Sequence, residues 1–328
     1  MGGKQAVDAP LAAAAETSGE RAAEAFSLLA NETRLAILLA LWEAYEPYAA
    51  DDAVSFSALR DRVGIRQGAQ FNYHLDQLVG RFVKKTAAGY TLRRAGHELV
   101  RTLVAGTGIE DASQDPVEIS IDCPFCDAPT AVTYQDEWLY IVCTECDGGF
   151  QGGDRPEGML SGTEFDPAGL TDRRPEMMWR AGWLTGKSHI QLAVEGVCDA
   201  CSGPITQSLD VCSDHDADGL CDCCGRQFAV QARFRCPVCK NHHDAPPRTI
   251  VLHHPAAIAF YYERGVNVQY DDGSFESLRR RGELISDHEQ ELVDEDPPRV
   301  RVTIRYEGDE LSVLLDETLD VVEIEQSD

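Results

Sequence analysis

Paired cysteines are the residues of this 328-residue chain whose type and spacing point most directly to chemistry. Most of the twelve cysteines are separated by two residues from another cysteine or a histidine, a spacing that lets one tight turn deliver two ligands to a metal ion. The first two pairs are Cys123/Cys126 and Cys143/Cys146. They flank strand-like runs at 130–134 and 138–142, which predicts a zinc ribbon in which four thiolates enclose one structural zinc ion and leave no position for a substrate.

A denser set of ligand pairs follows between residues 198 and 243. The pairs are Cys198/Cys201, Cys212/His215, Cys221/Cys224 and Cys236/Cys239. The simplest interpretation is a second ribbon whose zinc ion is held by the first and third of these pairs. A further ion would use the second and fourth pairs, interleaved as in cross-brace folds, with His242 and His243 as competing ligands. The sequence therefore predicts two structural zinc ions and leaves a third open, and we expect Cys223 to be a small buried thiol.

The stretch from Ser57 to Arg94 predicts two short helices followed by a β-hairpin. Ser57 is the expected N-cap of a helix over 58–63, and Gly64 ends that helix by adopting a left-handed backbone. The second helix is expected over 69–79. Its apolar residues, spaced to form one buried stripe, are Phe71, Leu75 and Leu78.

The opposite face of this second helix carries amide, phenol and imidazole groups, which can hydrogen-bond base edges in a DNA major groove. Short strands at 82–86 and 90–94 add a hairpin, which gives the winged-helix arrangement. From Arg60 to Arg101 the chain has nine basic and three acidic residues, although its formal charge is −27. The candidate DNA-contacting residues are Arg66, Gln67, Gln70, Asn72, Tyr73, His74 and Gln77 around the helix and Lys84, Lys85, Arg93 and Arg94 on the hairpin. A helical hairpin with an ordinary solvated face is the alternative.

Segment 25–101 resembles the ArsR-like winged-helix transcription regulators, in a form common in halophilic archaea. The resemblance rests on the runs FSLLANETRLAILLALWEA, FSALRDRVGI, GAQFNYHLDQLVG and YTLRRAGHELV. It implies that the helix containing FNYHLDQL enters the major groove of double-stranded DNA, that the hairpin contacts the DNA backbone, and that two chains form a homodimer. The segment contains no cysteine, so the resemblance does not extend to the metal-sensing motif of arsenic- and cadmium-responsive members.

Composition restricts the environment of the protein. Acidic residues outnumber basic ones by 56 to 29, and lysines make up only five of the basic residues, which indicates a protein solvated in concentrated salt. At molar salt the Debye length is about 3 Å, so short-range contacts to bases should contribute more affinity than long-range attraction. The sequence has no apolar run of about 18 residues to span a membrane and no convincing export signal. We expect a cytoplasmic protein whose cysteines bind metal rather than form disulfides.

The expected fold class is α+β with several domains. A disordered tail at 1–18 precedes a winged helix-turn-helix domain at 19–106, with a capping box at Thr17 and Glu20 and a second cap at Asn31. After an acidic boundary come a zinc ribbon at 119–150, a loop and helical connector at 151–197, and a second zinc-binding module at 198–243. A C-terminal α+β segment at 244–328 contains a β-hairpin about Glu307.

These observations predict a sequence-specific DNA-binding transcription regulator, not an enzyme, whose C-terminal half contacts an effector or a protein partner. One rival is a protein-docking adaptor without specific DNA binding, since the chain outside the basic stretch is strongly acidic. A second rival is an enzyme with an open metal site near His242, His243, His253 or His254. Metal chemistry distinguishes them, because an enzyme needs an exchangeable ligand position whereas a regulator or adaptor holds zinc in closed sites.

Overall fold

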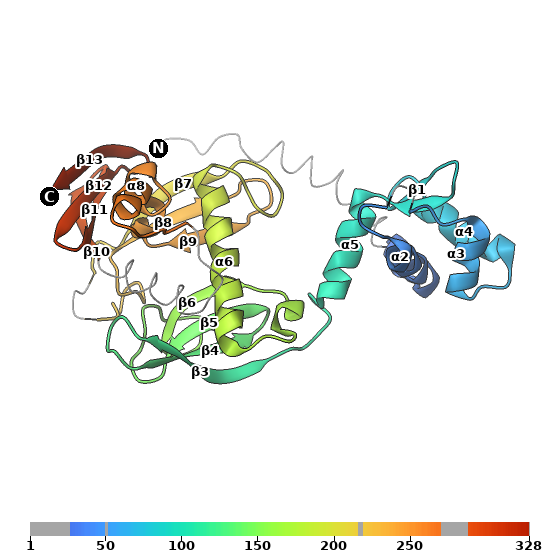
Figure 1. The fold of residues 1–328 in the computed structure, drawn as a ribbon, viewed down its shortest axis with the longest axis horizontal. Coiled ribbons are helices and arrows are strands. Elements are labelled where there is room, and N and C mark those ends of the chain that lie inside the picture. The colour runs from blue at the N-terminus through green and yellow to red at the C-terminus, as the bar shows by residue number, and fades with distance from the viewer. Residues whose placement is uncertain (1–26, 50–51, 216–218, 270–287, 328) are drawn as a thin grey trace, which may run out of the picture. The chain divides into compact units, whose positions relative to one another are not determined.

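A computed structural model of the chain describes residues 27–49, 52–215, 219–269 and 288–327. The chain folds as two compact units, Met1–Ile109 and Glu110–Asp328, and each combines helices with antiparallel strands (Figure 1). The predicted α+β class is therefore confirmed. The tail predicted at 1–18 and the capping box at Thr17 and Glu20 lie outside the described residues. Among the helices that are described, none combines the length and apolar character needed to cross a membrane.

The first unit combines helices with one short hairpin. Its elements are α2 (Glu32–Ala44), α3 (Phe56–Val63), α4 (Gly68–Leu78), β1 (Val83–Lys85), β2 (Tyr90–Leu92) and α5 (Arg94–Ala105). Asn31 caps α2 as predicted, because its side chain accepts a hydrogen bond from the amide of Arg34. The predicted stripe of α4 is also confirmed. Phe71, Leu75 and Leu78 are completely buried and pack with Ile37, Leu38 and Leu59.

The start of α3 differs from the prediction. Ser55, rather than Ser57, is the N-cap, and its hydroxyl accepts a hydrogen bond from the amide of Ala58 at 3.3 Å. The earlier start places Phe56 within the helix, where its ring meets that of Phe71 with the centroids 5.1 Å apart. Aromatic packing therefore determines which of two nearby serines caps the helix.

The hairpin of the first unit is shorter than predicted. Lys85 pairs with Tyr90 and Val83 with Leu92, and Val54 adds a further antiparallel bridge to Tyr90. Arg93 is the N-cap of α5 and Arg94 is its first residue, so neither belongs to the second strand. The Arg93 guanidinium donates to the carbonyl of Gly80, which holds the chain at the point where strand changes to helix.

The second unit begins with a four-stranded antiparallel sheet. Its strands, in spatial as well as chain order, are β3 (Gln114–Asp122), β4 (Pro129–Gln135), β5 (Trp138–Cys143) and β6 (Met159–Glu164). The sequence predicts only β4 and β5. Both missed strands lie at sheet edges, where burial on one face is weak. β3 is acidic, contains a proline and buries only Ile119, while β6 lies among glycines in a stretch expected to be a loop.

Helix α6 (Pro175–Val194), preceded by the short helix η1 (Pro167–Leu170), packs against this first sheet and also against a second sheet (Figure 1). The second sheet has the order β7 (Thr206–Val211), β8 (Val230–Arg235) and β9 (His242–Ala245). Helices α7 (Pro247–Val251) and α8 (Pro255–Glu263) follow. The helix predicted within the connector is therefore present, as one long helix that contacts two sheets.

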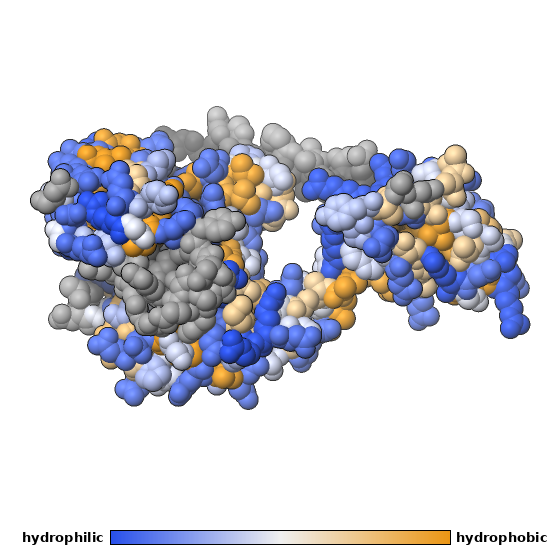
Figure 2. Space-filling model, in the orientation of Figure 1, coloured by the Kyte–Doolittle hydropathy of each residue, from blue (hydrophilic) through white to orange (hydrophobic). Residues whose placement is uncertain are grey.

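A third sheet completes the second unit. It is an antiparallel meander of β10 (His288–Glu295), β11 (Pro298–Tyr306), β12 (Asp309–Leu315) and β13 (Val321–Ser327). The hairpin predicted about Glu307 joins β11 to β12. Phe234, Phe260, Val302 and Val313 belong to one buried cluster shared by the second and third sheets. One compact unit thus contains all four modules predicted at 119–150, 151–197, 198–243 and 244–328. The face of the molecule seen in Figure 2 is mostly hydrophilic.

Candidate metal centres and nucleic-acid interface

Strand register brings together the first group of potential metal ligands, which we call cluster 1 (Cys123, Cys126, Cys143 and Cys146). Thr130 of β4 pairs with Cys143 of β5, so the turn before β4 and the turn after β5 lie at the same end of the sheet. The Sγ atoms of Cys123 and Cys146 are 3.7 Å apart, and those of Cys126 and Cys143 are 3.5 Å apart. A tetrahedral site with zinc–sulfur bonds of about 2.3 Å has sulfurs about 3.8 Å apart. Cluster 1 can therefore hold a metal ion, and it is the ligand set that the sequence predicts.

Electrostatics in cluster 1 favour a bound cation. Burial raises the pKa of the Cys123 thiol to about 12. Burial acts in the same direction on Cys143, but the amides of Cys146 and Glu145 donate to its sulfur at 3.3 and 3.4 Å and bring its pKa down to about 7. The turn therefore stabilises one thiolate by hydrogen bonds, and a cation would displace the proton of the buried thiol as well.

Cluster 2 consists of Cys198, Cys201, Cys236 and Cys239. Its Sγ–Sγ distances are 3.6 Å between Cys198 and Cys239 and 3.6 Å between Cys201 and Cys236. Cluster 3 consists of Cys212, His215, Cys221 and Cys224, and the Nδ1 atom of His215 is 3.5 Å from the sulfur of Cys224. Each cluster brings together four ligands that can hold one ion.

These two ligand sets correct the prediction, which joined Cys198 and Cys201 to Cys221 and Cys224. The cause is the antiparallel pairing of β7 with β8. Thr206 pairs with Arg235, so the turn before β7 and the turn after β8 share one end of the sheet. Val211 pairs with Val230, so the two ligand pairs in the loop between β7 and β8 lie at the other end of the sheet. Cys198/Cys201 therefore shares a cluster with Cys236/Cys239, and Cys212/His215 shares one with Cys221/Cys224.

Cys223 was expected to be buried, and this expectation is wrong. It is exposed, and it is the one cysteine outside the three clusters. The two neighbouring positions of the same turn, Cys221 and Cys224, direct their sulfurs into cluster 3. Cys223 lies between them in the same turn, and its thiol is within hydrogen-bonding reach of Cys212, a member of cluster 3.

Cluster 3 also joins the first sheet to the second. The amide of Gln151 donates to the carbonyl of Gly225 at 2.7 Å, and the amide of Gln227 donates to the carbonyl of Gly149 at 3.1 Å. Gly225 has φ +64, and a Cβ there would lie 2.7 Å from the carbonyl oxygen of Gln151. The loop that carries Cys224 therefore docks on the loop that follows cluster 1 and requires glycine to do so.

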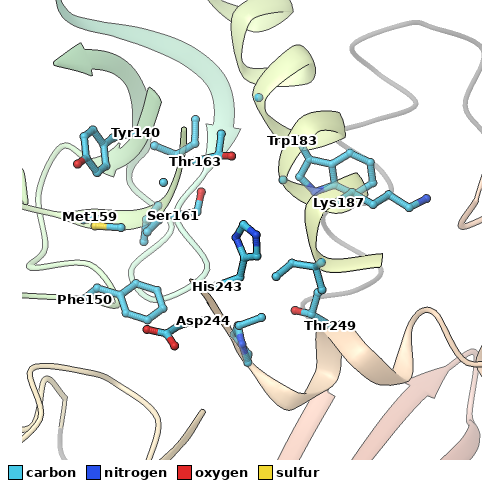
Figure 3. Close-up of a pocket in the computed structure, with 18 of the residues that line it drawn as sticks. Tyr140, Phe150, Met159, Ser161, Thr163, Trp183, Lys187, His243, Asp244 and Thr249 are labelled. Atoms are coloured by element: carbon cyan, nitrogen blue, oxygen red, sulfur yellow. The ribbon is translucent and has the colours of Figure 1, made fainter. Parts of the chain in front are cut away.

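A cleft of about 1150 Å³ lies in the second unit, with walls formed by the first sheet, α6, β9 and α7. Figure 3 shows the His243 ring in the middle of this cleft, between Ser161 on one side and Trp183 of α6 on the other. The Nε2 atom of His243 is 2.9 Å from Oδ1 of Asp199, and Nε2 of His189 is 3.6 Å from Oδ2 of the same carboxylate. Sequence analysis did not identify His189 or Asp199, because neither has a metal-ligand spacing to a partner.

The other histidines considered for an open metal site have different surroundings. His254 is the N-cap of α8, and its Nδ1 atom accepts a hydrogen bond from the amide of Ala256 at 3.2 Å. The Nδ1 atom of His253 lies 2.7 Å from the carbonyl oxygen of Thr249, and burial lowers the pKa of its imidazole. His242 is exposed on β9. Only His243 of the four belongs to a group of potential ligands in the described part of the chain.

The candidate DNA-contacting residues lie in the first unit around α4 and the hairpin. Those exposed are Arg66, Gln67, Gln70, Asn72, Tyr73, Gln77, Lys84, Lys85, Arg93 and Arg94. Tyr73 is 60% exposed, which is unusual for a large aromatic side chain on a packed helix. His74 is half-buried, and its Nδ1 atom is buried without a hydrogen-bond partner among the described residues. Asn72 donates to Asp76 at 2.6 Å.

Fold and clusters together define a two-unit α+β protein whose larger unit carries three cysteine-rich groups that can hold metal ions. Residues 120–321 match the family described as "Domain of unknown function (DUF7351)", and the chain belongs to this family because the match covers more than half of it. Residues 22–103 match "Domain of unknown function (DUF7347)". The two matches fall on either side of the boundary between the units. No curated protein and no solved structure matches the chain.

Proposed function

We propose that the protein is a sequence-specific DNA-binding transcription regulator of the ArsR-like winged-helix type, stabilised by three structural zinc ions. The observation that carries the proposal is the exposed polar face of α4 beside a basic hairpin. Gln70, Tyr73 and Gln77 are exposed at intervals of three and four residues, on the side of the helix opposite the buried stripe. Glutamine amides can pair with adenine edges, and a solvent-facing tyrosine adds both a hydroxyl and an apolar ring.

Basic residues extend this surface on both sides of α4. Arg66 precedes the helix, and Lys84 and Lys85 are exposed on β1. In the proposed complex, α4 lies in the major groove while the hairpin lysines contact phosphates and set the orientation of the protein. A single helix reads few base pairs, so we propose that the regulator acts as a homodimer on a two-fold symmetric site.

Zinc is the metal that the three clusters fit best. Sets of four cysteines, or of three cysteines and one histidine, are typical of structural zinc, because soft thiolates favour it and a tetrahedron suits its geometry. Each cluster has all four ligands from protein side chains, which leaves no open position for a substrate. The ions would then stabilise the sheets of the second unit, which binds an effector or a protein partner.

Selection of DNA from a randomised duplex library tests the proposal. The full-length, zinc-loaded protein is incubated with the library in molar KCl, and the retained DNA is sequenced. We expect an enriched motif with two-fold symmetry. The Tyr73→Ala and Gln77→Ala variants should relax the motif by about 1–3 kcal/mol of discrimination at the bases they contact.

Tyr48→Ala is the matched control, because Tyr48 is a fully exposed tyrosine of the same unit that lies outside α4 and the hairpin. It should leave the motif unchanged. Lys84→Ala should weaken binding to all sequences alike. No enrichment by a folded protein would refute the proposal and favour the docking adaptor. Equal losses in the Tyr48 and Tyr73 variants would refute direct readout by α4.

A further inference from the structure

We propose that His189, Asp199 and His243 form an open site for a divalent first-row transition-metal ion, such as Zn²⁺, Co²⁺ or Fe²⁺, in the wall of the cleft. This site is distinct from the three cysteine clusters and independent of DNA binding. Its three ligands come from α6, from the turn between the two cysteines of Cys198/Cys201, and from β9. Tertiary packing alone brings them together.

The geometry suits direct coordination. The potential ligand atoms of the three residues lie within 4.8 Å of one another. In a tetrahedral site with bonds of about 2.0–2.1 Å to nitrogen and oxygen, ligand atoms are separated by about 3.3 Å. The two nitrogen–oxygen distances, 2.9 Å at His243 and 3.6 Å at His189, bracket this value. The imidazole rings are tilted by 32° with centroids 5.4 Å apart, so small side-chain rotations would direct both nitrogens to one ion.

A supporting residue orients the carboxylate. The Asn241 amide donates to Oδ1 of Asp199 at 2.7 Å. All three ligand side chains are largely buried, with exposed fractions of 24% for His189, 13% for Asp199 and 14% for His243. Ligands held in one orientation by packing and by such an outer hydrogen bond lose little freedom on binding a metal.

The site differs from the clusters in having an open coordination position. Three protein ligands leave at least one position free for water or for an oxygen-donor ligand, as in catalytic zinc sites and in two-histidine, one-carboxylate iron sites. His189 and His243 both line the cleft, so the free position would face it. The nitrogen and oxygen ligands also make the site harder than a thiolate cluster, and metal exchange there should be faster.

Unpaired polar atoms in the same cleft suggest that it receives a polar ligand. Gln231 is 2% exposed, and its Oε1 atom has no hydrogen-bond partner within the described part of the chain. The buried Nε2 atom of His253 is likewise unpaired there. Both residues line the cleft. Buried polar atoms are normally satisfied, so water or a bound molecule is the expected partner.

The alternative is that the three side chains form a hydrogen-bonded contact between α6 and β9 and bind no metal. Adding Co²⁺ to the full-length protein with its cysteine clusters loaded with zinc distinguishes the two. We expect one further equivalent of Co²⁺ to bind, with visible d–d absorption but without the sulfur-to-cobalt charge-transfer band that a cysteine site produces. The affinity for this ion should fall more than about a hundredfold in His189→Gln and His243→Gln, because loss of outer-shell partners alone costs about 10–100-fold.

His242→Gln is the matched control, since His242 is the exposed neighbour of His243 and lies outside the group. It should bind the extra ion like the unsubstituted protein. Circular dichroism and retained zinc would establish that each variant is folded. The proposal is overturned if the folded protein binds no extra equivalent, if all bound cobalt shows the sulfur band, or if His189→Gln and His243→Gln bind the ion as His242→Gln does. None of these outcomes depends on whether the protein selects a DNA sequence.

Discussion

Serine substitutions in pairs test the ligand sets of clusters 2 and 3 by counting metal ions. Cys201 and Cys236 have sulfurs 3.6 Å apart and belong to one cluster, whereas Cys221 belongs to another. We therefore expect the double variant Cys201→Ser, Cys236→Ser to lose one tightly bound ion, the same as either single variant. The double variant Cys201→Ser, Cys221→Ser should lose two. A complete structural zinc site contributes about 10–16 kcal/mol of binding free energy, which depends on all four ligands. Removal of one ligand should therefore weaken binding enough for a chelator to take the ion.

The assay is metal content per folded chain after dialysis against a mild chelator, which removes exchangeable ions. The unsubstituted protein should retain three ions, the Cys201/Cys236 variant two, and the Cys201/Cys221 variant one. Cys223→Ser is the matched control, since Cys223 is an exposed cysteine outside the clusters, and it should retain three. The ligand sets inferred from sequence alone predict the reverse order for the two double variants. That reversed order would refute the argument from the β7–β8 register.

Three further predictions concern stability. Burial, together with the charge of Arg101, lowers the pKa of His97 below its ordinary value of 6.5. Because the unfolded chain then binds a proton more readily, the contribution of His97 to the free energy of unfolding of the first unit should be constant above about pH 6.5 and decrease below it. An equal decrease with pH in the His97→Gln variant would contradict this cause. Leu75→Ala removes a completely buried side chain and should cost about 2–5 kcal/mol in urea unfolding of the first unit without changing metal content; a loss of metal would indicate that the units depend on each other. Gly225→Ala should loosen the contact between cluster 3 and the first sheet, because the added methyl group would meet the carbonyl oxygen of Gln151. Amide hydrogen exchange at Gln151 and Gln227 should then become faster. Unchanged exchange would show that the close approach tolerates a methyl group.

Local pattern was sufficient for much of the first unit. The i, i+4, i+7 spacing of Phe71, Leu75 and Leu78 predicted the buried face of α4, because a helix repeats every 3.6 residues whatever surrounds it. The N-cap of α3 was misplaced by two residues, since choosing between Ser55 and Ser57 depends on Phe56 reaching a distant ring. Edge strand β3 was missed although Val117, Ile119 and Ile121 alternate with polar residues, because it lies in an acidic, proline-containing stretch interpreted as a domain boundary. Edge strand β6 has no apolar alternation and lies in a glycine-containing stretch expected to be a loop.

The sequence by itself determined which residues are paired as potential metal ligands, because a turn of four residues brings its first and last side chains together irrespective of the rest of the fold. It did not determine which pairs share an ion. That depends on which strand ends meet, and the β7–β8 register brings Cys198 and Cys201 to Cys236 and Cys239. Within the group of His189, Asp199 and His243, the sequence singled out only His243 and did not link it to the other two residues. The three residues lie on three separate segments, and only the packing of α6 against β9 brings their side chains to one point.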